Sequence, residues 1–337
     1  MSEKPILRIK DLDVRYYTDA GIVRANNQIN LELKPGERVG LVGESGSGKS
    51  TLALAILRMI KPPGTIAGGE IWLDDIELTR LSEERMRQIR GKDISMVPQG
   101  AMNSLNPVMR IKDQIIDTMI DHDLGLSRAE MEELAIEALR ATELDPKVGN
   151  MYPHELSGGM KQRACIAISV AMNPKVIIAD EPTSALDVIT QRQVMETLGR
   201  LQERLGSAII LIGHDMGLMA QFVDRIAVMY AGWMMELGKI EDVFTNPLNP
   251  YTQLLISSLP LLDRRGEFSG IPGITPPLTD LPPGCVFNDR CPQAMAVCRT
   301  AMPPLREHEP EHLAACYLYE NGIKVTEERH DEAVRAQ

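Results

Sequence analysis

A glycine-rich segment followed by a lysine and a serine carries the clearest chemical signal in this chain. Residues 43–50 read GESGSGKS and fit the pattern G-x-x-x-x-G-K-[ST], directly after the apolar run at 39–42. Such glycines let backbone N–H groups surround phosphate oxygens, Lys49 neutralises the outer phosphates, and the Ser50 hydroxyl can ligate Mg²⁺. The pattern predicts a site for a nucleoside triphosphate at the start of a helix. The predicted phosphate-binding residues are Gly43, Glu44, Ser45, Gly46, Ser47, Gly48, Lys49, Ser50 and Thr51.

A second element ends in two adjacent carboxylates. Residues 176–181 read VIIADE, an apolar strand followed by Asp180 and Glu181. The strand can deliver Asp180 to the Mg²⁺ shell, while Glu181 stands where it could polarise an attacking water. An apolar strand that ends in acids is common, so its value depends on the phosphate loop upstream.

A third segment reads LSGGM at 156–160, about twenty residues before the acidic strand. Ser157, Gly158 and Gly159 offer a hydroxyl and bare amides at a helix N-terminus, which suits a second γ-phosphate site. Because the first loop already holds the triphosphate, this second site can serve only the nucleotide of another subunit. The segment resembles the signature of ATP-binding cassette (ABC) ATPases, and the resemblance implies a composite site across a dimer.

The resemblance also gives roles to four further positions. Gln99 is similar to the residue that reaches Mg²⁺ and the attacking water, and His214 to the histidine that holds the γ-phosphate. Residues 184–187, ending in Asp187, resemble the loop that crosses the dimer interface. Tyr16 is similar to the aromatic residue that stacks on adenine, with neighbouring Tyr17 as the competing assignment. Each would be read as structural if found alone, but together they follow the order of the family.

Three positions depart from the usual pattern. Met160 stands in place of a glutamine in the signature, Gly213 in place of a threonine before the histidine, and Gly100 in place of an acid after Gln99. None of these changes removes a group assigned to chemistry. We therefore expect a chain that hydrolyses ATP with the help of Glu181, His214 and Gln99.

Short motifs at 104–107, 152–155, 228–232, 249–252 and 271–273 resemble the ATP-binding subunits of oligopeptide/dipeptide importers. The resemblance implies an ATPase coupled to solute import, held peripherally at the cytoplasmic face of the membrane. Its partners would be two transmembrane permease subunits, a second similar ATP-binding subunit and, indirectly, an extracytoplasmic solute-binding protein. Importers of nickel, glutathione or oligosaccharides remain open, and so does a non-transport ABC ATPase of DNA repair, translation or cluster assembly.

Four cysteines gather near the end of the chain. Spacers of five, six and seventeen residues separate Cys285, Cys291, Cys298 and Cys316, wider than the C-x₂-C pairs of a typical zinc ribbon. Four thiolates can also hold an iron–sulfur cluster, and some members of the resembled subfamily carry a [4Fe–4S] cluster there. We expect that cluster, with zinc or four unligated thiols as the alternatives. Cys165 lies apart and is expected to be a packing residue.

The elements that must position these residues indicate an α/β fold. Strand-like runs at 29–33, 38–42, 94–97, 176–179 and 208–212 alternate with helical segments, as in a parallel nucleotide-binding sheet. Strand signals stop between 109 and 151, where Ser127 as N-cap and Glu130 in a capping box predict the start of a helix.

These patterns predict a P-loop ABC-type nucleotide-binding domain over 1–259, with a helical subdomain at about 108–172. A Pro-rich linker at 260–284, a small cysteine-containing extension at 285–320 and a loose tail at 321–337 complete the expected organisation.

Composition narrows the class of protein further. The 337 residues carry 36 Lys and Arg against 47 Asp and Glu, a net charge of −11 that argues against nucleic acid as a main partner. With 44% apolar residues the chain can bury a full core, yet it has no apolar run long enough to cross a bilayer. The N-terminus has no apolar segment behind its charges, so we expect no secretory signal and a reducing environment.

Overall fold

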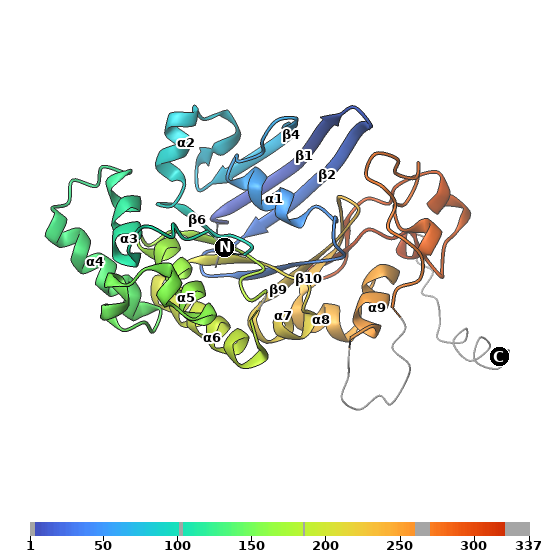
Figure 1. Cartoon of the computed structure of the whole chain (residues 1–337). Helices are drawn as coiled ribbons and strands as arrows, with labels where there is room; N and C mark the ends of the chain where they lie inside the picture. The colour runs from blue at the N-terminus through green and yellow to red at the C-terminus, as the bar shows by residue number, and fades with distance from the viewer. Residues whose placement is uncertain (1–3, 101–103, 185, 260–269, 321–337) are drawn as a thin grey trace.

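The computed structural model describes residues 4–100, 104–184, 186–259 and 270–320. The expected tail at 321–337 and residues 260–269 of the expected linker lie outside the described residues. Figure 1 shows two sheets at the centre, helices at one side and the C-terminal segment at the other. The strands are β1 (Leu7–Thr18), β2 (Gly21–Leu33), β3 (Arg38–Val42), β4 (Gly64–Leu73), β5 (Ile76–Glu77), β6 (Ile94–Val97), β7 (Val176–Asp180), β8 (Ala208–Ile212), β9 (Arg225–Tyr230), β10 (Trp233–Lys239), β11 (Arg306–Glu309) and β12 (His312–Ala314).

The helices pack around these sheets. None of those in the described ranges is both long enough and apolar enough to cross a membrane. The α-helices are α1 (Lys49–Ile56), α2 (Glu83–Ile89), α3 (Ile111–Ile120), α4 (Arg128–Ala141), α5 (Gly158–Val170), α6 (Val188–Leu205), α7 (Met216–Phe222), α8 (Ile240–Thr245) and α9 (Pro250–Ser257).

The larger sheet has the order β11-β12-β10-β9-β3-β8-β7-β6. Strands β6, β7, β8, β3 and β9 run parallel, whereas β10, β12 and β11 join antiparallel. Every residue of β7 and β8 is buried, as expected for parallel strands that are covered on both faces. The predicted strands at 38–42, 94–97, 176–179 and 208–212 all lie in this parallel core.

The smaller sheet is antiparallel, with the order β2-β1-β4-β5. It corrects one prediction, because residues 29–33 belong to β2 and pair antiparallel with β1 rather than with the parallel strands. Ile29, Leu31 and Leu33 are buried while Asn30 and Glu32 are exposed. That alternation is typical of an antiparallel sheet with one face in the core and one face in solvent.

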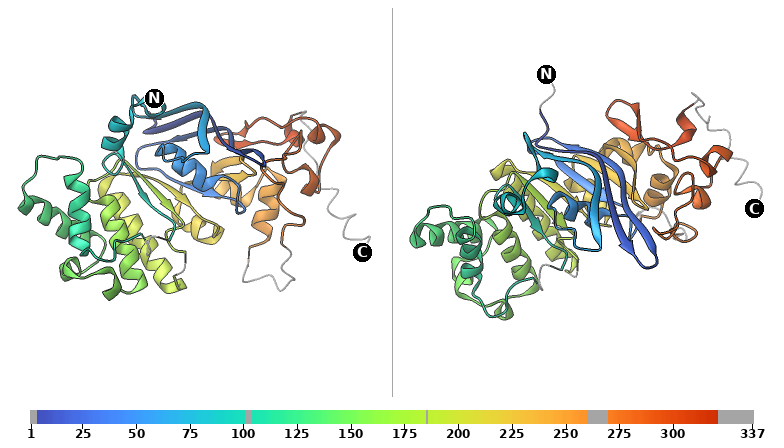
Figure 2. Two further views of the ribbon diagram at one scale, coloured as in Figure 1. Left: turned by 45° about the horizontal axis from the view of Figure 1, so that its top comes forward. Right: turned by 90° about the horizontal axis from the view of Figure 1, so that it is seen from above.

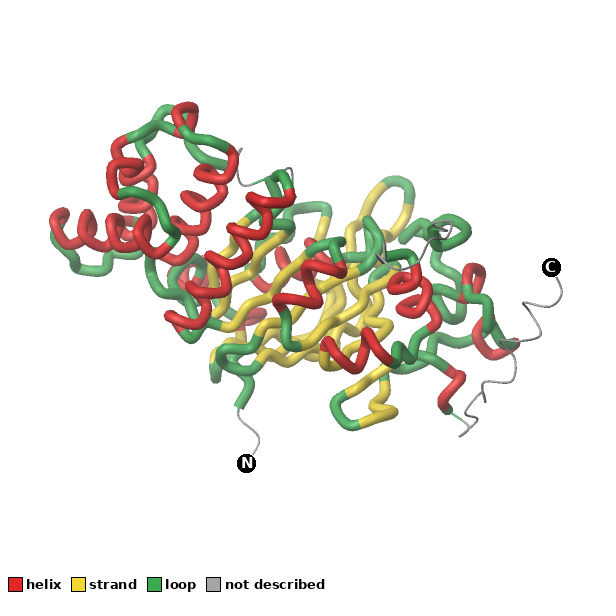
Figure 3. The backbone as a smooth tube through the Cα atoms, turned by 90° about the horizontal axis from the view of Figure 1, so that it is seen from below, coloured by secondary structure: helices red, strands yellow, loops and turns green. Residues whose placement is uncertain are grey.

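Side-chain alternation divides the core into two layers. Val176 and Ile178 of β7 pack in the cluster that contains α1 and the smaller sheet. Ile177 and Ala179 pack in the cluster that contains α5, α6 and α7. The larger sheet is therefore covered by α1 and the smaller sheet on one face and by helices on the other, which cross in front of the strands in Figure 3.

Helices α3, α4 and α5 form the helical part of the molecule. Ser127 is the N-cap of α4: its hydroxyl accepts a hydrogen bond from the Glu130 N–H at 3.3 Å, and the Glu130 carboxylate accepts from the Ser127 N–H at 2.7 Å. This confirms the predicted capping box. Both views in Figure 2 place this helical part and the C-terminal segment at opposite ends of the molecule.

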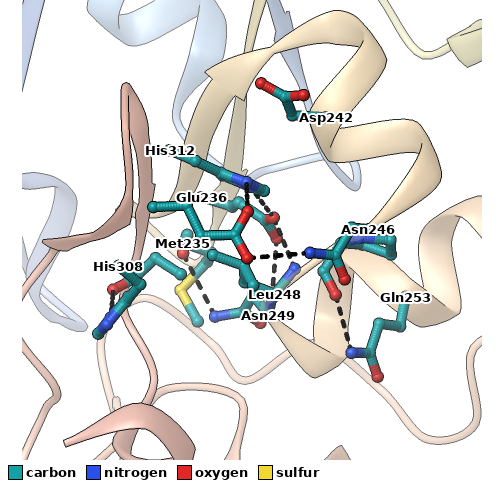
Figure 4. A network of polar contacts seen from close by, with 12 residues as sticks. Met235, Glu236, Asp242, Asn246, Leu248, Asn249, Gln253, His308 and His312 are labelled. Carbon is teal, nitrogen blue, oxygen red and sulfur yellow. Dashed lines mark hydrogen bonds and ion pairs between the residues drawn. The ribbon is translucent and has the colours of Figure 1, made fainter.

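The cysteine-containing segment continues the larger sheet, because β12 pairs with β10. A buried polar network supports this junction (Figure 4). The Glu236 carboxylate accepts hydrogen bonds from His312 Nε2 at 2.7 Å, from the Leu248 N–H at 2.8 Å and from the Asn249 N–H at 2.9 Å. Three parts of the chain thereby share one buried carboxylate. The division of the chain into domains near residue 260 stays a prediction.

Candidate nucleotide site

The predicted chemical residues meet at one edge of the larger sheet. Strands β3, β6, β7 and β8 are parallel neighbours or near neighbours, so their carboxyl ends lie at the same edge. The segments that leave these ends carry residues 43–50, Gln99, residues 180–181 and His214. Ligand sites of open α/β sheets lie at this edge.

Two glycines of the phosphate loop are required by close backbone contacts. Gly43 has φ +144°, and a Cβ built there would lie 2.0 Å from the Met229 carbonyl oxygen. Gly48 has φ +99°, and its Cβ would lie 2.2 Å from the Ala25 carbonyl oxygen. Only glycine fits both the positive φ and the available space. The loop is therefore fixed against β9 on one side and against β2 on the other.

Lys49 begins α1 and is held by its own loop. Its ammonium donates to the carbonyl oxygens of Gly43 at 2.7 Å and Glu44 at 3.0 Å, and to the Ser47 hydroxyl at 3.1 Å. Burial lowers the pKa of Lys49, although the nearby carboxylates of Glu181 and Asp180 act in the opposite direction. The cation thus lies inside the turn that would surround the phosphates.

Ser50 of α1 and Asp180 at the end of β7 lie in contact. The Ser50 hydroxyl donates to Asp180 Oδ1 at 3.2 Å. Burial raises the pKa of Asp180, and the Ser50 hydrogen bond and the charge of Lys49 only partly offset that effect. A hydroxyl and a carboxylate beside a phosphate loop are the hard oxygen donors that Mg²⁺ prefers, so the residues present fit the expected ion.

Glu181 lies between the other two predicted catalytic residues. Its Oε2 accepts a hydrogen bond from Gln99 Nε2 at 2.9 Å, and its Oε1 lies 3.5 Å from His214 Nδ1. Glu181 has φ +45°, an unusual value for a residue with a side chain and one that occurs preferentially at functional sites. The structure therefore brings Gln99, Glu181 and His214 into one cluster, with the His214 side chain 75% exposed.

The serine-glycine segment lies at the start of α5, next to the start of α6. Ser157 is the N-cap of α5, and its hydroxyl accepts a hydrogen bond from the Met160 N–H at 3.3 Å. The unusual Met160 supplies only a backbone group to this cap. Asp187 is the N-cap of α6. A Cβ added to Gly159 would lie 2.6 Å from the methyl carbon of Thr190 in α6, so the starts of the two helices are in close contact.

Gly158 is the first residue of α5, which packs with α3, α4 and α6, apart from α1 in Figure 1. Ser157 is exposed. The second predicted phosphate site is thus presented on the helical part of the molecule, and Ala185 of the predicted interface loop lies outside the described residues.

Tyr16 and Tyr17 lie on opposite faces of β1, as successive strand residues must. Tyr16 is half-buried and packs against the core cluster of α1 and the smaller sheet, and a Cβ on Gly64 would meet its ring at 2.5 Å. Tyr17 is 51% exposed. Tyr16 therefore lies on the same side of the smaller sheet as α1, which keeps the adenine prediction for it open.

All four C-terminal cysteines line one cavity of about 20 Å³, but their arrangement does not support the expected cluster. In the part of the chain that the structure describes, no group of three or more His, Cys, Asp or Glu side chains is placed as a metal site. Burial raises the pKa of the Cys285 thiol to about 11 and that of Cys316 to about 12. The thiol of Cys298 is buried and those of Cys285, Cys291 and Cys316 are partly buried, and their convergence on one cavity leaves a Cys₄ donor set available.

The sequence did not predict how closely the C-terminal segments contact the phosphate loop. Arg290 forms a two-point ion pair with Glu44, and the Tyr251 hydroxyl accepts a hydrogen bond from the Glu44 N–H at 2.9 Å. Tyr251 belongs to the 249–252 motif, which the sequence identified only as a subfamily mark. No spacing rule connects positions 44 and 290, so the sequence held no direct signal for the pair.

The phosphate loop leads into α1 and the serine-glycine segment begins α5, so the two predicted phosphate-binding segments lie on separate elements of one chain. Together with the two carboxylates at the end of β7, these segments define the class: a P-loop ATPase of the ABC type. A family model described as "ABC transporter" matches residues 26–184, and one described as "Oligopeptide/dipeptide transporter, C-terminal region" matches residues 235–298.

Relatives of known description match almost the whole chain. The oligopeptide transport ATP-binding protein OppD of Salmonella typhimurium is 44% identical over 315 residues, 93% of each chain. The dipeptide transport ATP-binding protein DppD of Lactococcus lactis is 41% identical over 330 residues, 97% of this chain and 95% of the relative. The chain belongs to the ABC transporter family of ATP-binding subunits and, with it, to the ATPases coupled to transport.

Solved structures agree with this assignment. The dimeric structure of MJ0796, described as a bacterial ABC transporter cassette, superposes with a TM-score of 0.63 at 32% identity, covering 69% of this chain and 98% of that one. A post-hydrolysis dimer of the same cassette, bound to ADP and Pi, gives a TM-score of 0.62 at 32% identity and the same coverage of both chains.

Proposed function

We propose that this protein is the ATP-hydrolysing subunit of an ABC importer for peptides, acting as a dimer with a second, similar ATP-binding subunit. The observation that carries the proposal is the convergence of Ser50, Asp180, Gln99 and Glu181 at one sheet edge, with Ser157 presented elsewhere on the same chain. The peptide substrate rests on the described roles of OppD and DppD, which match nearly the full length.

In this proposal the loop at 43–51 binds the phosphates of ATP, and Tyr16 packs against the adenine. Ser50, Asp180 and Gln99 would hold Mg²⁺, which neutralises charge on the β- and γ-phosphate oxygens. Glu181 accepts a proton from the attacking water, a task for which a carboxylate fixed by Gln99 at 2.9 Å is suited. His214, 3.5 Å from Glu181, orients that carboxylate and contacts the γ-phosphate.

Each partner would complete the site of the other. Ser157, Gly158 and Gly159 of one subunit face the γ-phosphate bound by the loop of its partner, where the helix N-terminus favours negative charge. Asp187 caps the helix beside this segment and would lie at the interface. Binding of two ATP molecules then closes the pair, and hydrolysis opens it.

We further propose two transmembrane permease subunits as the partners that receive this motion. The helical part at about 108–172 and the segment after Gln99 would contact them, with residues 101–103 outside the described part of the chain. This arrangement places the subunit peripherally at the cytoplasmic face of the membrane and couples it indirectly to an extracytoplasmic solute-binding protein. The domain division at 259, 284 and 320 belongs to the same proposal.

For the cysteine site we propose a [4Fe–4S] cluster held by Cys285, Cys291, Cys298 and Cys316, with zinc as the alternative. The donor set supports it, because all four thiols line one cavity. Ligation would require the thiols to lose their protons against the effect of burial. Iron, zinc and acid-labile sulfide, measured after anaerobic purification of the wild-type chain and of Cys291→Ser, test this site, with Cys165→Ser as the control.

The proposed function is tested by affinity purification of the full-length chain from detergent-solubilised membranes. We expect polytopic membrane proteins and a second ATP-binding subunit to co-purify, and ATPase activity to be lost with Lys49→Ala. Recovery of an active ATPase without any polytopic partner would contradict the importer assignment. Undiminished ATP affinity in Lys49→Ala would contradict the phosphate-loop assignment.

A further inference from the structure

Glu44, the second residue of the phosphate loop, bonds to the C-terminal segment of the chain. Its Oε2 accepts from Arg290 Nη1 at 2.7 Å, and its Oε1 accepts from Arg290 Nη2 at 2.8 Å. Thr275 donates its hydroxyl to the same carboxylate, and Tyr251 receives the Glu44 N–H. Three C-terminal residues therefore hold both the side chain and the backbone of one loop residue.

Arg290 is engaged through all three nitrogens of its guanidinium. Nε donates to the Pro272 carbonyl at 2.7 Å, and Nη2 donates to the Ile271 carbonyl at 3.2 Å. Nη1 also reaches the Tyr230 hydroxyl at 3.0 Å, and the guanidinium lies over the rings of Tyr230 and Phe287 at 5.6 and 5.7 Å. A planar fork that binds a carboxylate at two points and stacks on rings is a role that lysine cannot reproduce.

The pair is removed from solvent. The Arg290 side chain is 6% exposed and that of Glu44 is 24% exposed. Burial alone would raise the pKa of Glu44, but its bonds to Arg290 and Thr275 lower it. A buried charge whose partner is deleted is strongly destabilising, so both ends of the pair must be present together.

The body that carries Arg290 is itself fixed to the core. Phe287 packs with Tyr230 and Tyr251 at ring-centroid distances of 5.2 Å. The strands that follow continue the sheet through the buried bond between His312 and Glu236. A segment of the C-terminal part that packs against the core thus contacts the phosphate loop at Glu44.

We propose that Arg290 is a positioning residue for ATP binding, which holds the phosphate loop in its phosphate-receiving conformation through Glu44. The inference rests on the proposed ATP site and adds a part to it that lies outside the cassette motifs. The next residue along the chain is Cys291, one of the residues that line the cysteine cavity. Arg290 thereby connects the cysteine-containing segment to the phosphate loop.

The expected change in the apparent Kd for ATP follows from the fraction of molecules whose phosphate loop is in the conformation that binds ATP. If loss of the pair leaves the loop competent about one tenth of the time, the apparent Kd for ATP rises about tenfold. Arg290→Gln and Glu44→Gln should each produce this rise. Arg290→Lys should show an intermediate Kd, because one of the two bonds to the carboxylate is kept.

The experiment measures equilibrium binding of a fluorescent ATP analogue to the full-length chain, with melting temperature recorded for every variant. Arg299→Gln is the matched control, since Arg299 is an exposed arginine of the same segment. In the double variant Arg290→Gln/Glu44→Gln the Kd should rise no further than in either single variant, because both changes remove one contact. A purely structural role predicts lower melting temperatures without this non-additive change in Kd.

Two results would overturn the inference. One is a Kd for ATP within about twofold of the wild-type value in folded Glu44→Gln, because the inference expects a rise of about tenfold. The other is additive effects of the two substitutions on Kd. Lys49→Ala separates this failure from failure of the proposed function: if Lys49→Ala also binds ATP normally, the ATP site itself is misplaced. Should Arg290→Gln fail to fold, Glu44→Gln and Arg290→Lys still decide the matter.

Discussion

The substitution Glu181→Gln tests the assignment of the catalytic base most directly. Glutamine has nearly the same shape as glutamate, and its carbonyl oxygen can still accept the hydrogen bond that Gln99 Nε2 donates at 2.9 Å. Its backbone at position 181 keeps the same strain, because glutamine tolerates a φ of +45° no better and no worse than glutamate. The substitution therefore removes the ability to accept a proton and leaves the surrounding geometry in place.

The expected loss can be given a magnitude. General-base catalysis contributes about 10²- to 10⁴-fold, equal to about 2.7–5.4 kcal/mol of barrier. The Glu181 charge also acts on Lys49, so its removal leaves more of the lysine's positive charge for phosphate. We thus expect turnover to fall at least a hundredfold while ATP binding is kept or strengthened.

The assay compares steady-state phosphate release by the assembled complex with the nucleotide retained after gel filtration. Glu181→Gln should retain unhydrolysed ATP in a closed pair, whereas Glu203→Gln, on the exposed face of α6, should behave as wild type. Turnover above a tenth of the wild-type rate in the Glu181→Gln complex would refute the assignment of Glu181 as the base.

Three further substitutions probe the loop and the C-terminal part. Gly48→Ala should lower the free energy of unfolding by about 2–5 kcal/mol and weaken ATP binding, because the added Cβ would lie 2.2 Å from a carbonyl oxygen. Gly46→Ala places its Cβ in open space and should lower the free energy of unfolding by only about 1–2 kcal/mol, as measured by denaturant titration. Phe287→Ala should cost about 3–5 kcal/mol, against less than 1 for the exposed Val297→Ala, by the same titrations. Burial alone would lower the pKa of His312, but the hydrogen bond to Glu236 raises that pKa above its usual value. The protonated His312 therefore contributes its whole stabilisation of the fold below pH 6.5, and this contribution is lost as the pH rises through the raised pKa. The fall in melting temperature from about pH 6 to about pH 9 should therefore be smaller in His312→Gln, and an unchanged fall would contradict the role of this pair.

The parallel core was predictable because local patterns determine it, whereas Gln99 and His214 of the candidate catalytic cluster were assigned by resemblance to ABC ATPases. Buried apolar runs such as Val176–Asp180 read directly as covered parallel strands, and parallel strands bring their carboxyl ends to one edge. Ser50 and Asp180, 130 positions apart, were both expected beside Mg²⁺ and form a hydrogen bond at that edge. Glu181 and His214, which the resemblance to ABC ATPases linked to the same reaction, lie 3.5 Å apart.

The smaller sheet and the junction of the C-terminal part were not predicted, for a physical reason. The register of β1 with β4 and of β10 with β12 depends on side-chain burial across distant segments, which no local period contains. Glu236 is fully buried within an apolar strand, and its partner His312 lies 76 positions away. A lone acid in a buried strand indicates that a partner exists, yet it does not say which one.

The composition of residues 270–284 suggested a linker, but the structure uses their backbone as a set of acceptors. Proline-rich segments leave carbonyl groups without partners of their own, since proline removes N–H donors and prevents regular pairing. The carbonyls of Ile271 and Pro272 receive the guanidinium of Arg290, and the Arg24 N–H donates to the Leu278 carbonyl at 3.1 Å. A segment whose composition suggests a linker is thus ordered by hydrogen-bond donors from other segments. One of these donors, Arg290, also binds Glu44 of the phosphate loop. The prolines that prevent a regular helix or strand pattern in this segment therefore also leave the carbonyl groups that hold Arg290 beside the proposed ATP site.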